Sequence, residues 1–491
     1  MQIIFFILAA TLIIPLNQMT NAQALFDKYF TGKTMRIDYF HIGDSKSELV
    51  TIDKIYQYDL YPGNRKNLID NFNNGKYYFN IYDKASGELI FSKGFDSYFG
   101  EYRTSEDAGK GIKRTYHETA IIPYPKNVIL FSIEKRDDKN LLAEIFKSEI
   151  DPGSISIIKD RISDSSVKIF QSLKNGEPEN KVDVAIIGEG YTKGEENKFQ
   201  SDLERFTKVF FNQEPYKSYK ERFNVYGVFK ASEESGVDEP DAGIFKNTVL
   251  SATFNSLGSE RYLLTEDNKT LIDLASHVPY DALYIMVNHK RYGGGGIYNW
   301  ACFFTADNQW SGYLFLHEFG HSFAGLADEY YTSDVAYNDF FKKTVEPVEP
   351  NITALLDKSD LKWKNKITPG IQIPTEWNKK EFDSLDFKWQ EKRRELNKKI
   401  AELKRNKADY KEIEAAENEY NSSDREHAEF VNRFLKENKN YNNVGAFEGA
   451  GYSQYGLYRP MIDCIMFTKA QKNFCKVCED AIIKVIKFYS E

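Results

Sequence analysis

The stretch Leu316–Tyr330, LHEFGHSFAGLADEY, contains the pattern H-E-x-x-H. Its apolar residues recur with helical spacing, which predicts a helix with one buried face and with His317 and His321, four residues apart, on another face. Two imidazoles at this separation can bind one zinc ion, and the intervening Glu318 then lies beside the metal as a general base. The stretch therefore predicts a helix that carries a catalytic zinc site.

A chance occurrence of this pattern is a weak alternative. The chain has only 7 histidines in 491 residues, so a random match is about a one per cent event. The flanking aromatic and glycine residues also argue against a surface helix with two solvent-exposed histidines. We therefore interpret the pattern as the site of a zinc peptidase.

A catalytic zinc needs a third protein ligand and an open position for water. The only histidine after His321 is His427, which lies in a highly charged segment. Gly325 can end the helix and let the chain turn back, which brings the next residues towards the metal. We predict Asp328 as the third ligand because its short side chain suits a tight return, with Glu329 as the alternative. A distant glutamate, as in thermolysin-like proteins, is a further alternative.

Segments on both sides of this helix share their motifs with one known family. The helix and its continuation have the pattern H-E-x-G-H-S-x-x-x-L-x-D-E-Y. The other matching segments are Gly188–Thr192, Ser232–Gly236, Gly445–Gly451, Tyr458–Pro460, Asp463–Met466 and Phe474–Cys478. Together they resemble the IgA-specific metallo-endopeptidase family, bacterial secreted zinc peptidases related to the metzincins. The resemblance covers about residues 160–491, and the region before it is similar to the family's N-terminal domain.

The resemblance implies a metzincin-like catalytic domain with one catalytic Zn²⁺. It assigns the zinc to His317, His321 and Asp328, and it makes Met466 the candidate for a structural methionine turn beneath the metal. The implied reaction is hydrolysis of a peptide bond by a zinc-activated water, with Glu318 as general base.

One feature departs from the metzincin pattern. Metzincins commonly have a glycine three residues, and the third ligand six residues, after the second histidine. Those positions hold Ala324 and Ala327 in this chain, and Gly325 and Asp328 each fall one residue later. This departure bears on the third ligand and leaves the assignment of the two histidines unchanged.

Other residues are candidates for contact with substrate. Tyr458 and Arg459 carry groups that can assist the oxyanion or hold substrate, and packing is the equal alternative. Ala301–Thr305, just before the helix, is a candidate edge strand for pairing with an extended substrate. The glycine run 293–296 is interpreted as a flexible loop next to the site.

The N-terminus has the character of an export signal. An apolar run from Ile3 to Leu16 is followed by small residues at Ala22 and Ala24, which predicts a cleavable signal peptide over residues 1–22. The run is short for a membrane anchor, and no later segment is apolar enough to span a bilayer. We expect a secreted or periplasmic bacterial protein with no membrane span in the mature chain.

Residues 23–155 are predicted to form an all-β, sandwich-like N-terminal domain. Short strand-like runs, such as Met35–Phe40 and Tyr77–Tyr82, are separated by residues typical of turns.

The sequence pattern changes near residue 155. Val182–Ile187, an amphipathic segment over 193–213 and Phe223–Phe229 indicate strand, helix and strand, hence an α/β sheet.

We assign residues 156–491 to the zinc metallopeptidase domain, with a charged helical insertion over about 333–442. Within it, residues 376–439 are dense in Lys, Glu, Arg and Asn and have helical apolar spacing. They predict a long helical hairpin, interrupted near Asn421–Asp424. Such a run is usually a solvated face; the alternative is that it restricts access to the cleft.

Charge and cysteine content narrow the classes of partner and cofactor. The net charge of −8 gives no reason to expect a nucleic acid partner. The four cysteines are Cys302, Cys464, Cys475 and Cys478. The close pair Cys475 and Cys478 is typical of zinc or redox centres, but no second close pair accompanies it. We therefore expect a disulfide or buried thiols.

The sequence as a whole predicts a secreted zinc metalloendopeptidase that acts on extracellular proteins or glycoproteins, host immunoglobulins among the candidates. The alternative is a catalytically inactive peptidase scaffold that serves as an extracellular protein- or glycan-binding module. The intact His317, Glu318 and His321 favour an active enzyme.

Overall fold

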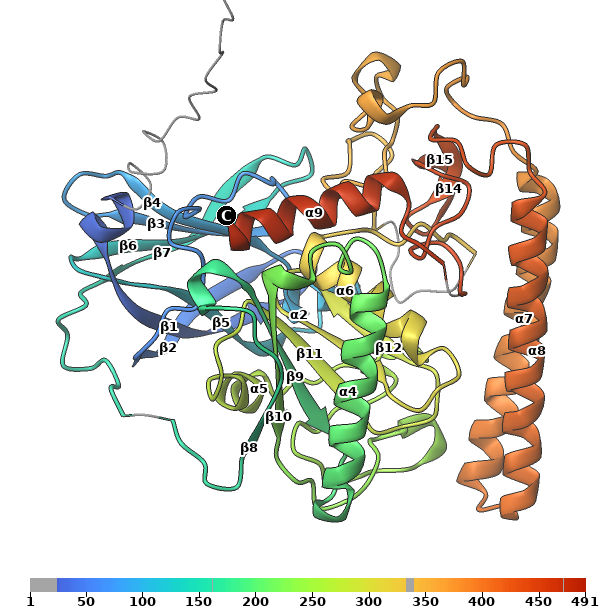
Figure 1. Ribbon diagram of the computed structural model, residues 1–491, viewed down its shortest axis with the longest axis horizontal. Helices are drawn as coiled ribbons and strands as arrows, with labels where there is room; N and C mark the ends of the chain where they lie inside the picture. Colours follow the sequence, from blue (N-terminus) through green and yellow to red (C-terminus); the bar gives the residue numbers. More distant parts are fainter. Residues whose placement is uncertain (1–23, 161, 333–339, 471) are drawn as a thin grey trace, which may run out of the picture.

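The computed structural model describes residues 24–160, 162–332, 340–470 and 472–491. The predicted signal peptide, 1–22, lies outside the described residues, as does the start of the predicted insertion, 333–339. A β-rich N-terminal region lies against a mixed α/β region, and a long pair of helices lies on the far side of the latter (Figure 1). Within the described ranges, no helix is both long and apolar enough to cross a membrane.

The N-terminal region contains two antiparallel sheets. The first has the strand order β2-β1-β5 and the second the order β4-β3-β6-β7. Their strands are β1 (Phe30–Gly43), β2 (Glu48–Tyr58), β3 (Tyr77–Asp83), β4 (Leu89–Phe95), β5 (Arg114–Pro125), β6 (Ile129–Arg136) and β7 (Leu142–Ile150). Side chains from both sheets, among them Ile37, Ile122, Phe79 and Phe131, form one apolar core. This packing of two sheets around a shared core matches a sandwich-like arrangement.

The expectation of an all-β N-terminal region is wrong in one respect. Two short helices, α2 (Tyr98–Tyr102) and α3 (Glu106–Gly109), interrupt the strands. Each begins after a serine, Ser97 or Ser105, whose side chain accepts a hydrogen bond from a backbone N–H of the first turn. The region is therefore β-rich rather than all-β, because local capping stabilises helical turns that apolar periodicity does not reveal.

A six-stranded mixed sheet forms the centre of the second region, in the order β12-β13-β11-β9-β10-β8. Its strands are β8 (Lys168–Leu173), β9 (Val182–Glu189), β10 (Phe223–Phe229), β11 (Ala282–Val287), β12 (Gly294–Ile297) and β13 (Ala301–Thr305). The four inner strands are parallel, and the edge strands β8 and β12 are antiparallel to their neighbours.

Two predictions about the strands next to the site are wrong. Residues Ala301–Thr305, predicted as an edge strand, form the internal strand β13. The glycine run predicted as a flexible loop forms the edge strand β12. Glycine is required there because the strand lies close to a helix: a Cβ on Gly296 would come within 2.4 Å of the backbone oxygen of Glu318.

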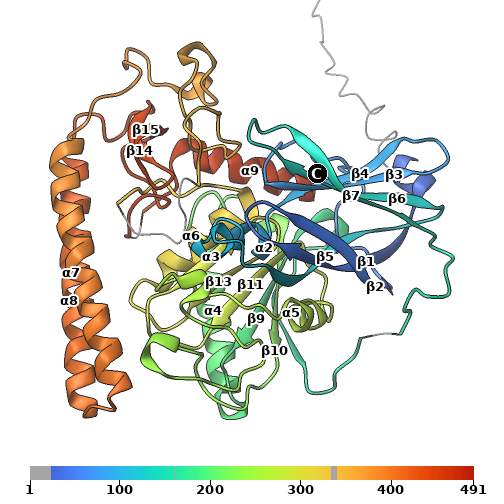
Figure 2. The ribbon, with the colours of Figure 1, turned by 180° about the vertical axis from the view of Figure 1, so that it is seen from behind.

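Helices cover both faces of this sheet. The helices α4 (Glu196–Asn212), α6 (Ser311–Ala324) and α9 (Lys476–Ser490) pack with Val184 and Ile186 in one core, and α5 (Asn268–Ala275) packs with Ala185 and Ile187 in a second core. Alternate side chains of β9 thus enter opposite cores, as strand geometry requires. Figures 1 and 2 both show α4 and α5 on opposite sides of the sheet.

The remaining elements connect these layers. Short 3-10 helices are η1 (Pro178–Asn180), η2 (Lys193–Glu195), η3 (Lys220–Arg222), η4 (Pro240–Ala242), η5 (Ser256–Gly258), η6 (Lys358–Asp360) and η7 (Lys364–Lys366). A two-stranded ribbon, β14 (Phe447–Ala450) with β15 (Ser453–Arg459), precedes α9.

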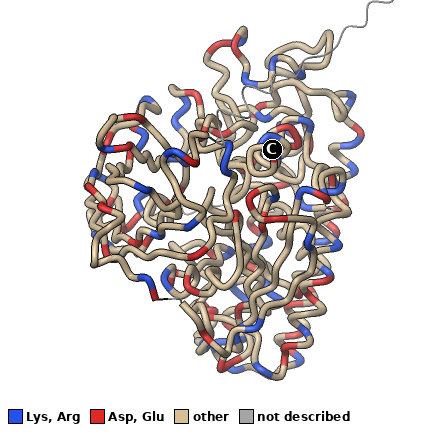
Figure 3. Tube along the Cα trace, turned by 60° about the vertical axis from the view of Figure 1, so that its left-hand side comes forward, with Lys and Arg blue, Asp and Glu red and all other residues tan. Residues whose placement is uncertain are grey.

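The charged segment forms two long packed helices, α7 (Lys379–Arg405) and α8 (Tyr410–Lys436). The predicted interruption near Asn421–Asp424 is wrong, because those residues lie within α8. The break is at residues 406–409, where Lys407 has a positive φ and the Asp409 side chain accepts a hydrogen bond from the backbone N–H of Lys411. Asp424 is instead buried and accepts a hydrogen bond from Trp310 Nε1. Basic and acidic residues are interspersed along the chain (Figure 3).

Candidate active site

Helix α6 carries the H-E-x-x-H pattern. Its C-cap, Gly325, has a left-handed conformation (φ 60°), and the backbone N–H groups of Gly325 and Leu326 donate to the carbonyls of His321 and Gly320. This is the glycine-terminated helix end that lets a chain reverse direction. The reversal brings the residues after Gly325 back over the last turn of the helix.

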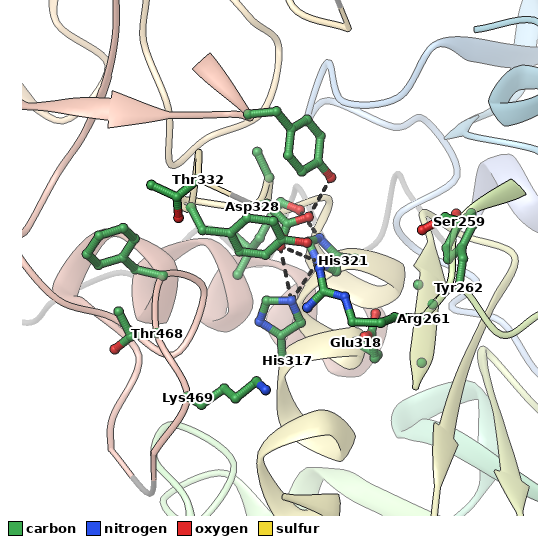
Figure 4. A pocket seen from close by; sticks show the side chains of 18 of the residues that line it. Ser259, Arg261, Tyr262, His317, Glu318, His321, Asp328, Thr332, Thr468 and Lys469 are labelled. Atoms are coloured by element: carbon green, nitrogen blue, oxygen red, sulfur yellow. Dashed lines mark hydrogen bonds and ion pairs between the residues drawn. The ribbon is translucent and has the colours of Figure 1, made fainter. Parts of the chain in front are cut away.

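The reversal brings together three side chains of types that can bind a metal ion. The Nε2 atoms of His317 and His321 are 3.2 Å apart, and Asp328 Oδ1 lies 3.1 Å and 3.2 Å from them. These distances are close to the roughly 3.4 Å between nitrogen ligands of a tetrahedral zinc ion. Figure 4 shows the three side chains pointing towards one another at the pocket.

The outward-facing nitrogens of both imidazoles already have partners. His317 Nδ1 lies 3.0 Å from the carbonyl oxygen of Ile465, and His321 Nδ1 lies 2.6 Å from that of Leu326. A carbonyl only accepts, so each Nδ1 carries a proton, and each Nε2 is the nitrogen that can give up its proton and bind a metal ion at the cluster. Such second contacts are usual for metal-binding histidines. The donor set therefore fits a divalent metal ion.

Electrostatics in the cluster favour a positive charge at its centre. Burial alone would lower the pKa of His321, but the carboxylate of Asp328 raises it to about 9. Burial would likewise raise the pKa of Asp328, yet the two histidines hold it far below its usual range. The Asp328 carboxylate thus stays ionised and attracts protons to the neighbouring histidines. A metal ion can take the place of these protons.

The alternative ligand Glu329, and His427, which is the only later histidine, both lie elsewhere. Glu329 is fully buried beside cysteine side chains, with Oε1 3.3 Å from Cys478 Sγ. His427 on α8 pairs with Asp386, with Nε2 2.7 Å from Oδ1. Of Asp328, Glu329 and His427, the structure brings only Asp328 to the two histidines.

Glu318 lies between the histidines in sequence and lines the same cavity, which has a volume of about 220 Å³. Its side chain is 8% exposed and lies against strand β12. Burial raises the pKa of Glu318, while the neighbouring histidines act to lower it. A carboxylate at this position is suited to exchange protons with a group in the cavity.

Met466 lies against helix α6 and is not among the residues that line the cavity. It is fully buried, and a Cβ on Gly320 would lie 2.8 Å from its Sδ. Its carbonyl oxygen accepts a hydrogen bond from the backbone N–H of Glu329. The turn that contains Met466 is thereby attached to the segment that carries Asp328.

Tyr458 and Arg459 are not among the residues that line the cavity. The Arg459 guanidinium is fully buried and donates to the carbonyl oxygens of Gly449 (2.7 Å) and Ile462 (3.1 Å). It also lies 3.8 Å from the ring centroid of Phe467. The charge of Arg459 is thus used in contacts within the fold.

Several residues at the cavity were not identified from the sequence. Arg261, Tyr313 and Tyr330 line it, and the Tyr452 hydroxyl donates to Asp328 Oδ2 at 2.5 Å. Tyr330 ends the H-E-x-x-H stretch, and Tyr452 directly follows the motif Gly445–Gly451. Their positions in or next to these motifs could have identified them as residues of the site. Arg261 lies in an irregular segment far from any motif, and no sequence pattern points to it.

Two imidazoles, one buried and one partly exposed, converge with a carboxylate beside a second carboxylate in a cavity, and such a site is suited to a metal-dependent hydrolase. The comparisons with known families agree with this class. A family model described as IgA Peptidase M64 matches residues 170–486, and one described as Peptidase M64 N-terminus matches residues 25–147. The chain belongs to the IgA peptidase M64 family and is a peptidase. No curated protein matches it.

Proposed function

We propose that this peptidase is a secreted zinc-dependent endopeptidase whose metal is held by His317, His321 and Asp328. The observation that carries the proposal is the convergence of two Nε2 atoms and one carboxylate oxygen within 3.1–3.2 Å of one another. The Nδ1 contacts to backbone carbonyls support it, because they leave both Nε2 atoms available to bind the metal ion.

A bound zinc ion would acidify a water molecule and polarise the scissile carbonyl. Glu318 would accept the proton of the attacking water at its carboxylate and return it to the departing amine nitrogen. The buried position of Glu318 beside the two histidines supports this role. Tyr452 holds Oδ2 of Asp328, which leaves Oδ1 directed at the histidines.

Two further roles belong to this proposal. Arg261 points into the same pocket and is a candidate to hold a substrate carbonyl, in place of Arg459 (Figure 4). Met466 would support the metal helix from below through its contact with Gly320.

The substrate class that we propose is extracellular protein or glycoprotein, which follows from the export signal expected over residues 1–22.

The decisive experiment compares Glu318→Gln with Asp328→Ala. Glu318→Gln should lower peptide hydrolysis by about 10³-fold, because it removes the proton acceptor, and should leave the zinc content unchanged. Asp328→Ala should lose both zinc and activity. The zinc content is measured by elemental analysis. The rate of hydrolysis is measured with a mixture of unstructured protein substrates.

Glu266→Gln is the matched control, because Glu266 is a half-exposed glutamate outside this cavity. It should behave as wild type. Full activity in Glu318→Gln would overturn the mechanism. Wild-type protein that binds substrate but never cleaves it would favour a binding scaffold.

A further inference from the structure

A second cluster of metal-binding side chains lies next to the candidate active site. It contains Glu329, Cys464, Cys475 and Cys478, all buried. One potential ligand atom from each residue lies within 4.8 Å of the others. The cysteines are free thiols, and the fourth cysteine, Cys302, is outside the cluster. Three thiols and a carboxylate from three segments of the chain thus meet at one point.

The spacing within this cluster resembles a zinc coordination sphere. Cys464 Sγ and Cys478 Sγ are 3.8 Å apart, and Glu329 Oε1 lies 3.3 Å from Cys478 Sγ and 3.9 Å from Cys475 Sγ. Around a tetrahedral zinc ion, two sulfur ligands are about 3.8 Å apart, and a sulfur and an oxygen ligand are about 3.5 Å apart. The ligand atoms already have the separations that a zinc ion would impose.

Neighbouring hydrogen bonds favour ionised ligands. The backbone N–H of Cys475 donates to Cys464 Sγ at 3.1 Å, and that of Cys478 donates to Cys475 Sγ at 3.5 Å. Cys475 is also the N-cap of α9, where the helix dipole stabilises negative charge. Asn351 Nδ2 donates to Glu329 Oε1 at 3.0 Å, which orients the carboxylate. Donors of this kind commonly surround metal-bound thiolates and carboxylates.

The carboxylate itself is incompletely satisfied. Glu329 is fully buried, and among the described residues its Oε2 has no hydrogen-bond partner. A buried, unpaired carboxylate oxygen costs free energy unless a cation compensates it. A disulfide between any two of the cysteines would leave one thiol over and would not compensate the carboxylate.

We propose that Cys464, Cys475, Cys478 and Glu329 form a second, structural zinc site. Three soft thiolates with one carboxylate in a closed tetrahedral arrangement suit Zn²⁺ better than a hard cation such as Ca²⁺. The site is closed because all four ligands come from the protein and are buried, so it has no position for substrate.

This second site holds the segments that build the candidate active site. Asp328 and Glu329 are adjacent, and their side chains reach the two different clusters. Cys464 precedes Ile465, whose carbonyl orients His317. A zinc ion bound by Glu329 and Cys464 would therefore hold two neighbouring residues in place. One is Asp328, the third ligand of the proposed catalytic zinc, and the other is Ile465, whose carbonyl orients His317. This consequence, and the expected total of about two zinc ions per wild-type chain, rest on the proposed function, whereas the thiolate site itself does not.

The test measures zinc in wild-type protein and in variants of each cluster. Wild-type protein should contain about two zinc ions per chain, and His321→Ala and Cys475→Ser should each contain about one. Cys302→Ala is the matched control, because it removes a buried thiol outside the cluster, and it should retain about two.

Cobalt substitution separates the two sites without depending on the folding of a cysteine variant. Cobalt-loaded His321→Ala retains all four cysteines, and it should show the near-ultraviolet charge-transfer absorption of cobalt–thiolate bonds. Glu329→Gln should weaken cobalt binding at this site without abolishing the absorption. The histidine cluster contains no sulfur and cannot produce this signal.

Two results would overturn the proposal. One is the absence of thiolate absorption in folded, cobalt-loaded His321→Ala. The other is a disulfide, detected as only two alkylatable cysteines in the denatured protein. Thiolate-bound zinc in a wild-type chain that shows no peptidase activity would support the second site while contradicting the proposed function, so the two failures are distinguishable.

Discussion

Gly294, on the edge strand β12, leaves the space that the Glu318 carboxylate occupies. A Cβ at this position would lie 2.6 Å from Glu318 Oε1 and 2.9 Å from the backbone oxygen of Phe303. The backbone oxygen cannot move easily, so the Glu318 side chain must shift. The absence of a side chain at one residue thus sets the position of the candidate general base.

We expect Gly294→Ala to lower kcat/KM about 10- to 100-fold, because a displaced general base transfers protons less efficiently. The zinc content should not change. Gly109→Ala is the matched control, since no atom lies within 4 Å of its added Cβ. Unchanged kinetics in a folded Gly294→Ala variant would show that the position of Glu318 is not critical.

Glu48 is a residue whose ionisation stabilises the N-terminal region. Burial alone would raise its pKa, but hydrogen bonds from His41 and Lys135 and the positive charge of Arg103 lower it to about 2. A carboxyl whose pKa is lower in the folded state stabilises the fold at pH values above its unfolded pKa, about 4.5. This stabilisation is lost as the pH falls from about 4.5 towards 2.

Glu48→Gln should therefore lower the free energy of unfolding at pH 7 by about 2 kcal/mol, after allowance for solvent screening. The difference from wild type should shrink as the pH falls below about 4.5. Urea denaturation at several pH values measures it. A difference that stays constant down to pH about 2 would mean that the charge of Glu48 does not contribute.

At the scale of elements, the hairpin of α7 and α8 contributes to the wall of the cavity. Asp386, Trp389 and Arg393 on α7 line it together with His427 on α8. The Trp389 ring stacks on the His427 ring, with centroids 5.0 Å apart and planes 18° apart. The base of the hairpin therefore contacts the space available to substrate, while most of its length is a charged outer surface.

Trp389→Ala should raise KM about tenfold and change kcat by less than about threefold, because it removes part of the cavity wall and leaves His317, His321 and Asp328 in place. Steady-state kinetics with a peptide substrate measures both. Leu396→Ala is the control: Leu396 is equally buried on the same helix but does not line the cavity. It should cost about 2–4 kcal/mol of stability without changing KM. Equal effects of both variants on KM would indicate that the hairpin acts only through stability.

At the scale of the whole molecule, buried polar contacts join the N-terminal region to the mixed α/β region. Arg36 on β1 is fully buried and binds Asp38 through two hydrogen bonds of 2.7 Å. Its Nη1 also donates to Asp273 on α5 at 2.5 Å. Asn74 and Asn299 add contacts between the regions near the end of α6. We expect the two regions to unfold together.

Arg36→Met should lower stability by about 3–5 kcal/mol, because Asp38 remains as a buried charge with less compensation. All five tryptophans lie between residues 300 and 389, so tryptophan fluorescence reports on the mixed α/β region and, through the contact of Trp300 with Tyr98, on its junction with the N-terminal region. The urea transition measured by fluorescence should nevertheless shift with that measured by circular dichroism. Arg114→Met, at a half-exposed ion pair, should cost at most about 1 kcal/mol. An unshifted fluorescence transition in Arg36→Met would show that the regions unfold independently.

The sequence by itself determined the family and the local part of the site. Hydrogen bonding within one helix fixes the relative positions of residues four apart, so the shared face of His317 and His321 follows from their spacing. The glycine after the helix likewise indicated where the chain reverses. The central strands were predicted because continuous apolar runs require burial.

Only the tertiary structure decided what comes together over long distances in the chain. Glu329 and Cys478 are 149 residues apart. The sequence has no second close pair of cysteines, so its pattern did not predict their cluster. Packing between segments likewise decided three other features. These are the edge position of β12, the contacts of Arg459 within the fold and the presence of Arg261 at the cavity. Local patterns record the hydrogen bonding and burial of one element, whereas proximity between elements depends on how all of them pack around shared cores.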